Sequence, residues 1–335
     1  MSDQHIFHFF LKHVEEQPQK IFIKQGSKSI SYLECFKKIT QIYDYLDKKN
    51  IGKHDAIGVH MGLKYEIILV YFAIIARGGS VIAMSPTLGA YEIKHLLKNS
   101  LSKTIIICNE FYEKSLNIAT HKIEVLNYDK FKESFSKKTS NTKEIESSML
   151  NLNIHKPTIL LTTSGSTGKP KLIVHNLFSM TKWGELYQKI MCISKNSIIL
   201  QPSPIGYASG ILFNIPCATI CGATLILPVS TTGLALLNLL SEEKVTHYGG
   251  VATISKSILE ALKEHPYLRP LFLKFIRLAG EYLSKGFIKE LYNSFPDTNI
   301  VLTYGATEGF GFLIYNLSSN FNNVEDGMMG RPAFN

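Results

Sequence analysis

Residues 163–171 have a composition suited to binding an anion. They read T-S-G-S-T-G-K-P-K and combine hydroxyl side chains with two glycines and two lysines. Glycine lets backbone N–H groups approach an anion closely, hydroxyls donate hydrogen bonds and lysines add positive charge. The apolar segment before them predicts a strand over 158–163. We therefore expect a phosphate-binding loop that directly follows a strand.

Two other assignments compete for the same residues. A Walker A loop has four residues between its glycines and a Ser or Thr after its lysine. Here two residues separate Gly165 from Gly168, and Pro170 follows Lys169, so the spacing argues against a Walker-type NTPase. The second alternative is an ordinary mobile surface loop, which the composition alone leaves open.

Two further segments carry residues suited to holding a nucleotide. Residues 304–308 read Y-G-A-T-E and follow an expected strand over 299–302. An aromatic face suits a purine, and a carboxylate suits a hard cation such as Mg²⁺ that bridges phosphates. Residues 279–281, A-G-E, end an expected strand, and glycine there would let the backbone lie against a flat ring. Taken singly, a solvated loop acid and a simple strand-to-helix turn are the alternatives.

Short apolar strands alternate with helices along the chain, and these elements would position the three segments. The pattern predicts strands over 56–61, 80–84, 104–108, 197–200, 224–227, 246–251, 275–279 and 299–304. It predicts helices over 65–76, 91–98, 234–244, 255–265 and 283–295. Strands separated by such helices form mostly parallel sheets, so the expected fold class is α/β, with two similar subdomains. Ligands in such sheets bind beyond the carboxyl ends of the strands.

The three segments together resemble the signature motifs of the adenylate-forming superfamily. That superfamily includes acyl- and aryl-CoA synthetases, adenylation domains of peptide synthetases and luciferases. The match at 163–171 is the most specific, although Leu172 stands where many relatives carry glycine. Weaker matches, taken as structural, lie at 31–34 (S-Y-L-E) and 76–86, and the resemblance extends to Pro332. It implies that the protein uses ATP and Mg²⁺ to activate a carboxylic acid as an acyl-adenylate.

The resemblance implies a role for each residue of the phosphate loop. The residues that would handle the β- and γ-phosphates of ATP are Thr163, Ser164, Gly165, Ser166, Thr167, Gly168, Lys169 and Lys171. Among them, Thr163 and Lys171 are the expected catalytic residues.

The other two segments would bind the adenine, the α-phosphate and the metal ion. By the resemblance, Tyr304 packs against adenine, Thr307 contacts the α-phosphate and Glu308 helps to hold Mg²⁺, which makes Glu308 the third expected catalytic residue. Four more residues are expected to bind the nucleotide, namely Gly280 and Glu281 on the adenine side, together with Gly305 and Ala306.

The acid-binding pocket is inferred from two further segments. In amino-acid-activating relatives, an Asp after the strand at 197–200 binds the substrate ammonium. Residues 202–211 read P-S-P-I-G-Y-A-S-G-I without an acid, and a buried ammonium without a countercharge is costly, so an α-amino acid is disfavoured. The segment is similar to that of acyl- or aryl-CoA synthetases, although Ala252 stands where relatives usually have proline. The implied acid-binding residues are Tyr207, Gly210, Gly249, Gly250 and Val251.

The resemblance also implies a division of the chain. A first α/β subdomain is expected over about 50–190, a second over 20–49 and 191–315, and the start of a β-rich third subdomain over 316–335. The polar, Lys/Ser/Thr-rich segment 134–148 predicts an exposed linker. The ribose-binding Asp and the C-terminal lid domain with its catalytic lysine are expected beyond Asn335, so the chain alone would be a poor or inactive catalyst.

Two accounts of the function are left open by the sequence. In the first, the chain is the core of an acid–thiol ligase of the acyl-CoA synthetase type, with CoA or a carrier-protein thiol as acceptor. In the second, it is a stand-alone, non-catalytic module that binds ATP, AMP or an acyl-adenylate and that another polypeptide completes.

The composition limits the kinds of partner and the cellular compartment that we expect for this protein. The formal net charge is +9, from 36 Lys and Arg against 27 Asp and Glu, but no basic run typical of a nucleic-acid-binding arm is present. Five cysteines without framework spacing fit reduced thiols. The N-terminus lacks the basic segment of a signal peptide, and the longest apolar stretch, 67–76, is too short to cross a bilayer. We expect a cytoplasmic protein with neither a nucleic-acid partner nor a membrane span.

Overall fold

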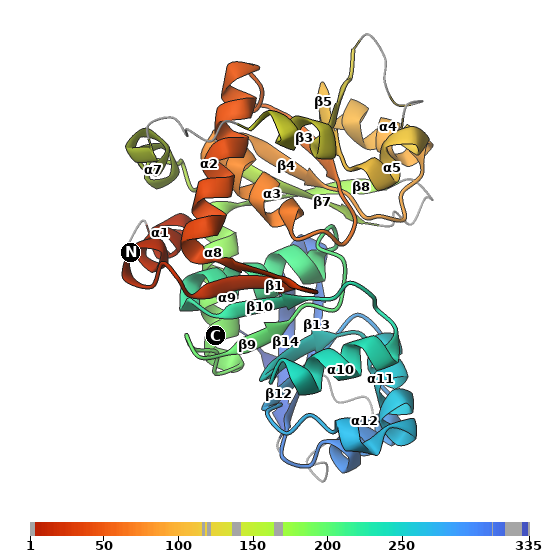
Figure 1. The fold of residues 1–335 in the computed structure, drawn as a ribbon. Coiled ribbons are helices and arrows are strands. Elements are labelled where there is room, and N and C mark those ends of the chain that lie inside the picture. The colour runs from red at the N-terminus through yellow and green to blue at the C-terminus, as the bar shows by residue number, and fades with distance from the viewer. Residues whose placement is uncertain are drawn as a thin grey trace. The chain divides into compact units, whose positions relative to one another are not determined.

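The computed structural model describes residues 4–115, 118, 122–135, 142–163, 170–309, 311–318 and 330–333. The chain divides into two compact α/β units (Figure 1). The first comprises Met1–Ile21, Ile30–Lys182 and Pro204–Ile211, and the second comprises Phe22–Ser29, Trp183–Ser203 and Leu212–Asn335. The division differs from the expected one at residues 20–21, 30–49 and 204–211, which belong to the first unit, and at residues 183–190, which belong to the second.

A six-stranded sheet forms the centre of the first unit. Its order is β6-β5-β3-β4-β7-β8, with β3 (Ala56–His60), β4 (Ser80–Ala83), β5 (Thr104–Ile107), β6 (Glu124–Asn127), β7 (Pro157–Thr163) and β8 (Lys171–Asn176). All neighbouring strands are parallel except β7 and β8, which are antiparallel. The carboxyl ends of the parallel strands therefore meet at one edge of the sheet, and β8 returns from that edge.

The helices of the first unit include one whose start follows a clear local sequence signal. They are α1 (Ile6–Glu16), α2 (Tyr32–Lys48), α3 (Glu66–Ala76), α4 (Ala90–Asn99), α5 (Asn109–Ser115), α6 (Tyr128–Phe131) and α7 (Thr142–Leu150), followed by the start of α8 (Leu177–Ile190). Helix α2 begins at a capping box, in which Ser31 Oγ accepts from the Glu34 N–H at 3.1 Å and Glu34 Oε2 accepts from the Ser31 N–H at 2.8 Å. The S-Y-L-E match at 31–34 therefore has a local structural cause.

Helix α3 is buried along its whole length. It is apolar on all sides and packs against α2, α7, β3 and β4. In the part of the chain that the structure describes, neither this helix nor any other combines the length and the hydropathy needed to cross a membrane.

Residues 142–148 are helical, so the prediction of an exposed linker over 134–148 is wrong for this part. Ile145 and Met149 are four residues apart on α7 and both are buried. Ser148 Oγ also donates a hydrogen bond to the carbonyl oxygen of Ala76 at 2.7 Å. Two apolar side chains in a polar segment are enough to dock one face of a short helix, which the composition did not reveal. Residues 136–141 lie outside the described ranges.

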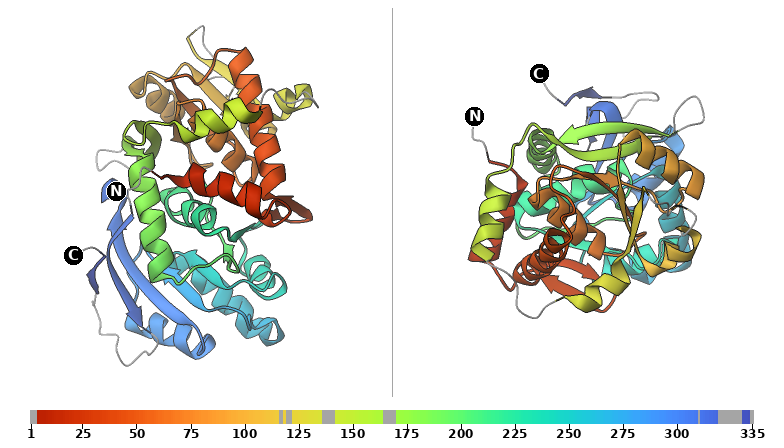
Figure 2. Two further views of the ribbon diagram at one scale, coloured as in Figure 1. Left: turned by 90° about the vertical axis from the view of Figure 1, so that its left-hand side faces the viewer. Right: turned by 90° about the horizontal axis from the view of Figure 1, so that it is seen from above.

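A nine-stranded sheet forms the centre of the second unit. Its order is β15-β14-β13-β12-β11-β9-β10-β1-β2, with β1 (Ile21–Gln25), β2 (Lys28–Ser31), β9 (Ile198–Leu200), β10 (Thr224–Leu227), β11 (His247–Gly250), β12 (Phe275–Leu278), β13 (Asn299–Ala306), β14 (Gly311–Ser318) and β15 (Arg331–Pro332). The pairs from β1 through β10, β9, β11 and β12 to β13 are parallel. Strand β14 is antiparallel to β13, a long pair drawn in blue in Figure 2, and β15 is antiparallel to β14. Strands β14 and β15 thus extend this sheet into the region expected to begin a third subdomain.

The two faces of the nine-stranded sheet differ in character. The helices that complete the second unit are the end of α8, α9 (Ile215–Cys221), α10 (Gly233–Glu242), α11 (Ala252–Glu264) and α12 (Lys285–Ser294). On β11, β12 and β13, the residues that share one apolar core with α10, α11 and α12 are Tyr248, Ile276, Leu278, Ile300 and Leu302. Because side chains alternate along a strand, Gly249, Arg277 and Val301, which are register partners on β11, β12 and β13, face the opposite side. The predicted α/β class with mostly parallel sheets is confirmed.

Candidate nucleotide and acid site

The expected phosphate loop connects β7 to β8. Strand β7 ends at Thr163, as predicted, and β8 begins at Lys171. The two residues are opposite each other in the antiparallel ladder, which puts their Cβ atoms roughly 5 Å apart. Lys171 is exposed and Thr163 is half-buried. The remaining predicted loop residues, Ser164, Gly165, Ser166, Thr167, Gly168 and Lys169, lie outside the described ranges.

The Y-G-A-T-E segment spans the end of β13 and the turn after it. The strand continues through Ala306, so Tyr304, Gly305 and Ala306 are strand residues, and Thr307 and Glu308 lie in a 3₁₀ turn. A bulge in the ladder with β14 falls at Tyr304 and Gly305, and bulges bend a strand and redirect its side chains. Tyr304 is 54% exposed and Glu308 is exposed as well. An aromatic face and a carboxylate are therefore both open to a ligand.

The A-G-E segment forms the turn that follows β12. Gly280 has a φ of +84°, a conformation that glycine adopts without strain. Glu281 caps helix α11, because its carboxylate accepts hydrogen bonds from the backbone N–H and the hydroxyl of Thr253. Both residues thus have a structural reason for their identity, and their contact with adenine stays a prediction.

Three neighbouring parallel strands of the second unit end in expected site segments. Strand β11 leads into Val251, β12 leads into Gly280 and Glu281, and β13 carries residues 304–308. Adjacent strands lie about 4.8 Å apart. The structure therefore brings three separately predicted segments to one sheet edge, and this carboxyl edge is where open α/β sheets bind ligands.

The segment Pro204–Ile211 of the first unit packs closely on the residues that follow β4. A Cβ on Gly206 would collide with the carbonyl oxygen of Met84, and one on Gly210 would come within 2.7 Å of the Ile205 Cα. The Tyr207 hydroxyl lies 3.2 Å from Thr87 Oγ1. Glycines at 206 and 210 thus allow close backbone packing, which holds the partly exposed Tyr207 ring at the carboxyl end of β4.

Gly249 and Gly250 lie in different surroundings within the second unit. A Cβ on Gly250 would collide with the Tyr248 hydroxyl, which folds back across the strand. Gly249 points to the opposite face, where an added Cβ would lie 3.3 Å from both Arg277 Nε and the Tyr187 hydroxyl. Gly249 therefore places no side chain against Arg277 on the neighbouring strand, whereas Gly250 is required by packing.

Arg277 is a candidate site residue that was not predicted from the sequence. It lies in the otherwise apolar strand F-I-R-L, two residues before the A-G-E segment, and its side chain is only 2% exposed. Its guanidinium Cζ is 4.5 Å from the ring centroid of Phe213 and 5.9 Å from that of Tyr187. A charged residue inside a short apolar strand was the signal that could have identified it, because Arg is rarely fully buried without a partner.

The surroundings of Arg277 are apolar enough to raise the pKa of a neighbouring hydroxyl group. Burial raises the pKa of Tyr187 to about 12, although the positive charge of Arg277 acts in the opposite direction. Tyr187 is therefore neutral at neutral pH. A guanidinium group, in contrast, is not deprotonated in proteins. The site thus places a permanent positive charge in a water-poor environment.

Glu308 can contribute to a Mg²⁺ site of the kind that nucleotide-dependent enzymes use. Such sites hold the ion through one or two carboxylates together with substrate phosphates and water. The exposed Glu308 carboxylate in the turn after β13 fits that arrangement. Within the described ranges, no three His, Cys, Asp or Glu side chains converge as a metal site, and the arrangement does not need them.

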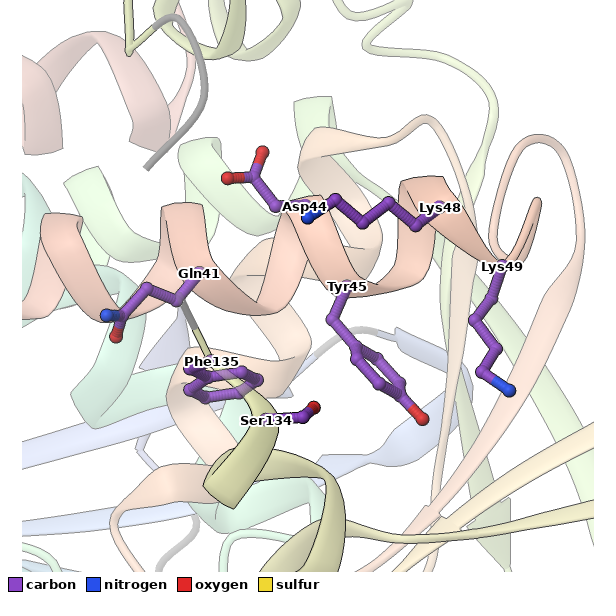
Figure 3. A pocket seen from close by; sticks show the side chains of 7 residues that line it. All are labelled: Gln41, Asp44, Tyr45, Lys48, Lys49, Ser134 and Phe135. Atoms are coloured by element: carbon purple, nitrogen blue, oxygen red, sulfur yellow. The ribbon is translucent and has the colours of Figure 1, made fainter. Parts of the chain in front are cut away.

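A separate hollow of about 400 Å³ lies in the first unit, between α2 and residues 134–135 (Figure 3). It is lined by Gln41, Asp44, Tyr45, Lys48, Lys49, Ser134 and Phe135. None of these belongs to the predicted nucleotide or acid segments. It is therefore not part of the candidate site.

Comparison with known proteins identifies relatives over the length of the chain. The profile of a family described as AMP-binding enzyme matches residues 10–335. Indigoidine synthase of Dickeya dadantii (strain 3937) is 22% identical over 300 residues, which cover 88% of this chain and 20% of that protein. The chain spans a fifth or less of the length of the first curated relatives it matches.

Solved structures share the fold at low sequence identity. The AMPPNP-bound form of the nonribosomal peptide synthetase FmoA3 has a TM-score of 0.85 and 16% identity, covering 98% of this chain and 34% of that chain. The anthranilate CoA ligase AuaEII in complex with anthranoyl-AMP has a TM-score of 0.84 and 16% identity, covering 98% of this chain and 63% of that chain. At this identity the likeness shows the fold alone. Because the family profile spans nearly the whole sequence and the fold agrees with it, the chain belongs to the AMP-binding enzyme family.

Proposed function

We propose that this chain forms the ATP- and acid-binding part of an enzyme that activates a carboxylic acid as an acyl-adenylate. A carboxylate oxygen of the acid attacks the α-phosphorus of ATP, the bond to the β-phosphate bridging oxygen breaks, and pyrophosphate leaves. The observation that carries the proposal is the convergence of the segments after β11, β12 and β13 at one carboxyl edge. Membership of the AMP-binding enzyme family supports it.

The exposed residues of the second unit would bind the nucleoside and the metal. The ring of Tyr304 is half exposed and suits stacking on adenine, beside the turn at Gly280. Thr307 would donate to the α-phosphate from the turn after β13, and Glu308 would hold Mg²⁺ against the phosphates. The metal ion would neutralise charge on the phosphate oxygens during the transfer.

The ends of the β7–β8 connection would bind the departing pyrophosphate. Thr163 and Lys171 are cross-strand partners, so a hydroxyl-bearing and an ammonium-bearing side chain start from neighbouring positions. With residues 164–169 they would hold the β- and γ-phosphates. Positive charge placed where negative charge develops stabilises the transition state, and one such donor contributes on the order of 10²–10³ in rate.

The acid would carry no α-ammonium group, and its final acceptor would be a thiol. Residues 202–211 contain no acid to pair with an ammonium, and the proposed acid-binding residues are Tyr207, Gly210, Gly249, Gly250 and Val251. Proteins with this fold include a nonribosomal peptide synthetase and an anthranilate CoA ligase. Both a carrier-protein thiol and CoA are therefore candidate acceptors, and a carrier protein is a candidate partner.

The decisive experiment is ATP–pyrophosphate exchange with a panel of aliphatic and aryl acids. It is measured for this chain and for any longer protein that contains it, alongside calorimetric binding of AMPPNP with Mg²⁺. Acid-dependent exchange with one class of acid would support the proposal. Binding of AMPPNP without exchange for any acid in the longer protein would favour the non-catalytic module instead, and a lack of AMPPNP binding would exclude both.

A further inference from the structure

Arg277 carries a positive charge into the interior of the second unit. In the ranges that the structure describes, no acidic side chain pairs with it. Its Nη1 lies 3.4 Å from Thr303 Oγ1, a long contact, and the side chain also hydrogen-bonds Tyr187. Its Nε is buried and has no hydrogen-bond partner. The guanidinium group therefore has unused capacity to bind an anion.

These surroundings stabilise the buried guanidinium group of Arg277 only in part, which argues against a purely structural role. Removing a guanidinium from water is expensive, and proteins normally offset it with a paired carboxylate and a full set of hydrogen bonds. Contacts with the rings of Phe213 and Tyr187 offset only part of that cost. A ligand that supplies an anion would offset the rest.

The side chain extends toward the edge at which the site segments meet. The register partner of Arg277 on β13 is Val301, yet its Nη1 contacts Thr303, two residues closer to the carboxyl end. Its Nε and Nη2 lie 3.3 and 3.5 Å from the position that a Cβ on Gly249 would occupy. Nε and Nη2 form the edge of a guanidinium that binds a carboxylate in a bidentate manner. Glycine at position 249 places no side chain against this edge.

The depth of Arg277 indicates which part of a substrate it would bind. Tyr304, at the proposed nucleotide, is 54% exposed, whereas Arg277 is 2% exposed on the adjacent strand. The carboxylate that reacts must reach the α-phosphate beside the exposed Y-G-A-T-E segment. A group held by Arg277 therefore lies at the far end of the acid, away from the nucleotide.

We propose that Arg277 binds a second carboxylate of the substrate, so that the preferred acid is a dicarboxylic acid activated at one end. The inference rests on the proposed function, because it assigns the substrate class of the same site. Arg277 then acts as a specificity-determining residue, which recognises the distal carboxylate through the Nε–Nη2 edge. Desolvation of the site makes that ion pair selective against neutral acids.

The test uses two non-hydrolysable acyl-adenylate analogues that differ in one group. Both are N-acyl sulfamoyl adenosines with the same chain, one ending in a carboxylate and the other in the isosteric amide. Their affinities are measured by calorimetry for the wild type, Arg277→Met, and Arg269→Met, which removes the same charge from an exposed position. The wild type and Arg269→Met should prefer the carboxylate by roughly tenfold or more, and Arg277→Met should lose the preference while its AMPPNP affinity is retained.

Several outcomes separate the inference from the function on which it rests. Equal wild-type affinity for the two analogues overturns the inference without any variant, and a preference that survives in Arg277→Met overturns it as well. If the wild type binds neither analogue nor AMPPNP, the proposed function fails and the inference falls with it. The thermal midpoint of ligand-free Arg277→Met provides a second reading, because removal of an unbalanced buried cation should leave the midpoint unchanged or raise it. A large drop would assign Arg277 a structural role instead.

Discussion

The carboxylate of Glu281 accepts a hydrogen bond from the Thr253 N–H at 3.1 Å and another from the Thr253 hydroxyl at 2.9 Å. Thr253 lies in the first turn of α11, where backbone N–H groups have no partner within the helix. The acid of the A-G-E segment, which follows β12, thus caps a helix that follows the neighbouring strand β11. This contact fixes the spacing between two of the strand ends that form the candidate site.

Replacement of Glu281 by alanine should lower the free energy of unfolding by about 1 kcal/mol, the usual effect of losing an N-terminal cap. Thr253→Val removes the hydroxyl contact but keeps the N–H, so it should cost less. Urea denaturation of both variants and of the double variant measures their coupling. Additive effects would contradict a direct interaction between the two side chains.

Alanine at Gly280 and at Gly286 should change stability in opposite directions. Gly280 has a φ of +84°, so Gly280→Ala should lose about 1–2 kcal/mol. Gly286 lies in the first turn of α12, and an added Cβ there meets nothing within 4 Å, so Gly286→Ala should gain up to about 1 kcal/mol from helix propensity. Denaturation midpoints measured under one condition compare the two. Equal losses at both positions would show that the backbone at Gly280 is not the cause.

Glu308→Gln should weaken Mg²⁺-dependent binding of AMPPNP by roughly tenfold or more, because an amide is a poorer ligand for a hard cation than a carboxylate. Glu264→Gln makes the same charge change at an exposed position near the end of α11 and should have no effect. Calorimetry with and without Mg²⁺ separates metal-dependent binding from the rest. An equal loss in the absence of Mg²⁺ would assign Glu308 a role other than holding the ion.

The stability of the protein should fall below about pH 6.5, in part because of His247. Burial lowers the pKa of His247 to about 4, and its Nε2 lies 2.8 Å from the Met191 carbonyl oxygen. The unfolded chain takes up a proton near pH 6.5, whereas the folded ring stays neutral. Its contribution is therefore fully present above pH 6.5 and is lost as the pH falls to 4, by about 1 kcal/mol per pH unit.

The His247→Gln variant tests this dependence. Its unfolding free energy should change less steeply between pH 6.5 and 4, while His155→Gln, at an exposed position, should follow the wild type. Burial lowers the pKa of His5 and of His60 to about 4 too, so part of the slope should remain. Superimposable profiles for the His247 variant and the wild type would contradict the assignment.

The alternation of strands and helices was predictable where an element carries its own apolar pattern. The prediction of a strand over 224–227 and of a helix over 65–76 agrees with β10 and α3 to within a residue. Helix α8, like α1, α2 and α9, was not predicted, and Gly184 interrupts its sequence. A Cβ there would lie 2.6 Å from the Ile220 side chain, so this glycine is required by the close approach of α9, which local propensity does not record.

The place of a candidate segment in the fold was predictable where the segment directly follows a strand. It was less predictable where contacts with residues distant in the sequence determine the local structure. The strand prediction near 299–304 is short of Ala306, because pairing with β14 extends β13 through the Y-G-A-T-E segment. Arg277 was overlooked because its candidate role depends on its neighbours Gly249, Tyr187 and Phe213, which lie far away in the sequence. Roles that depend on residues 164–169 stay predictions.

The burial of α3 has a consequence for synthesis on the ribosome. Its covering elements include α2, which is made before it, and α7, which is made long after it. At ordinary rates of translation, α7 emerges from the ribosome roughly 4–15 seconds after α3. During that time a helix that is apolar apart from Glu66 has an uncovered side, which is a binding site for chaperones and a starting point for aggregation. Slower translation of residues 77–150 should therefore reduce the yield of folded protein.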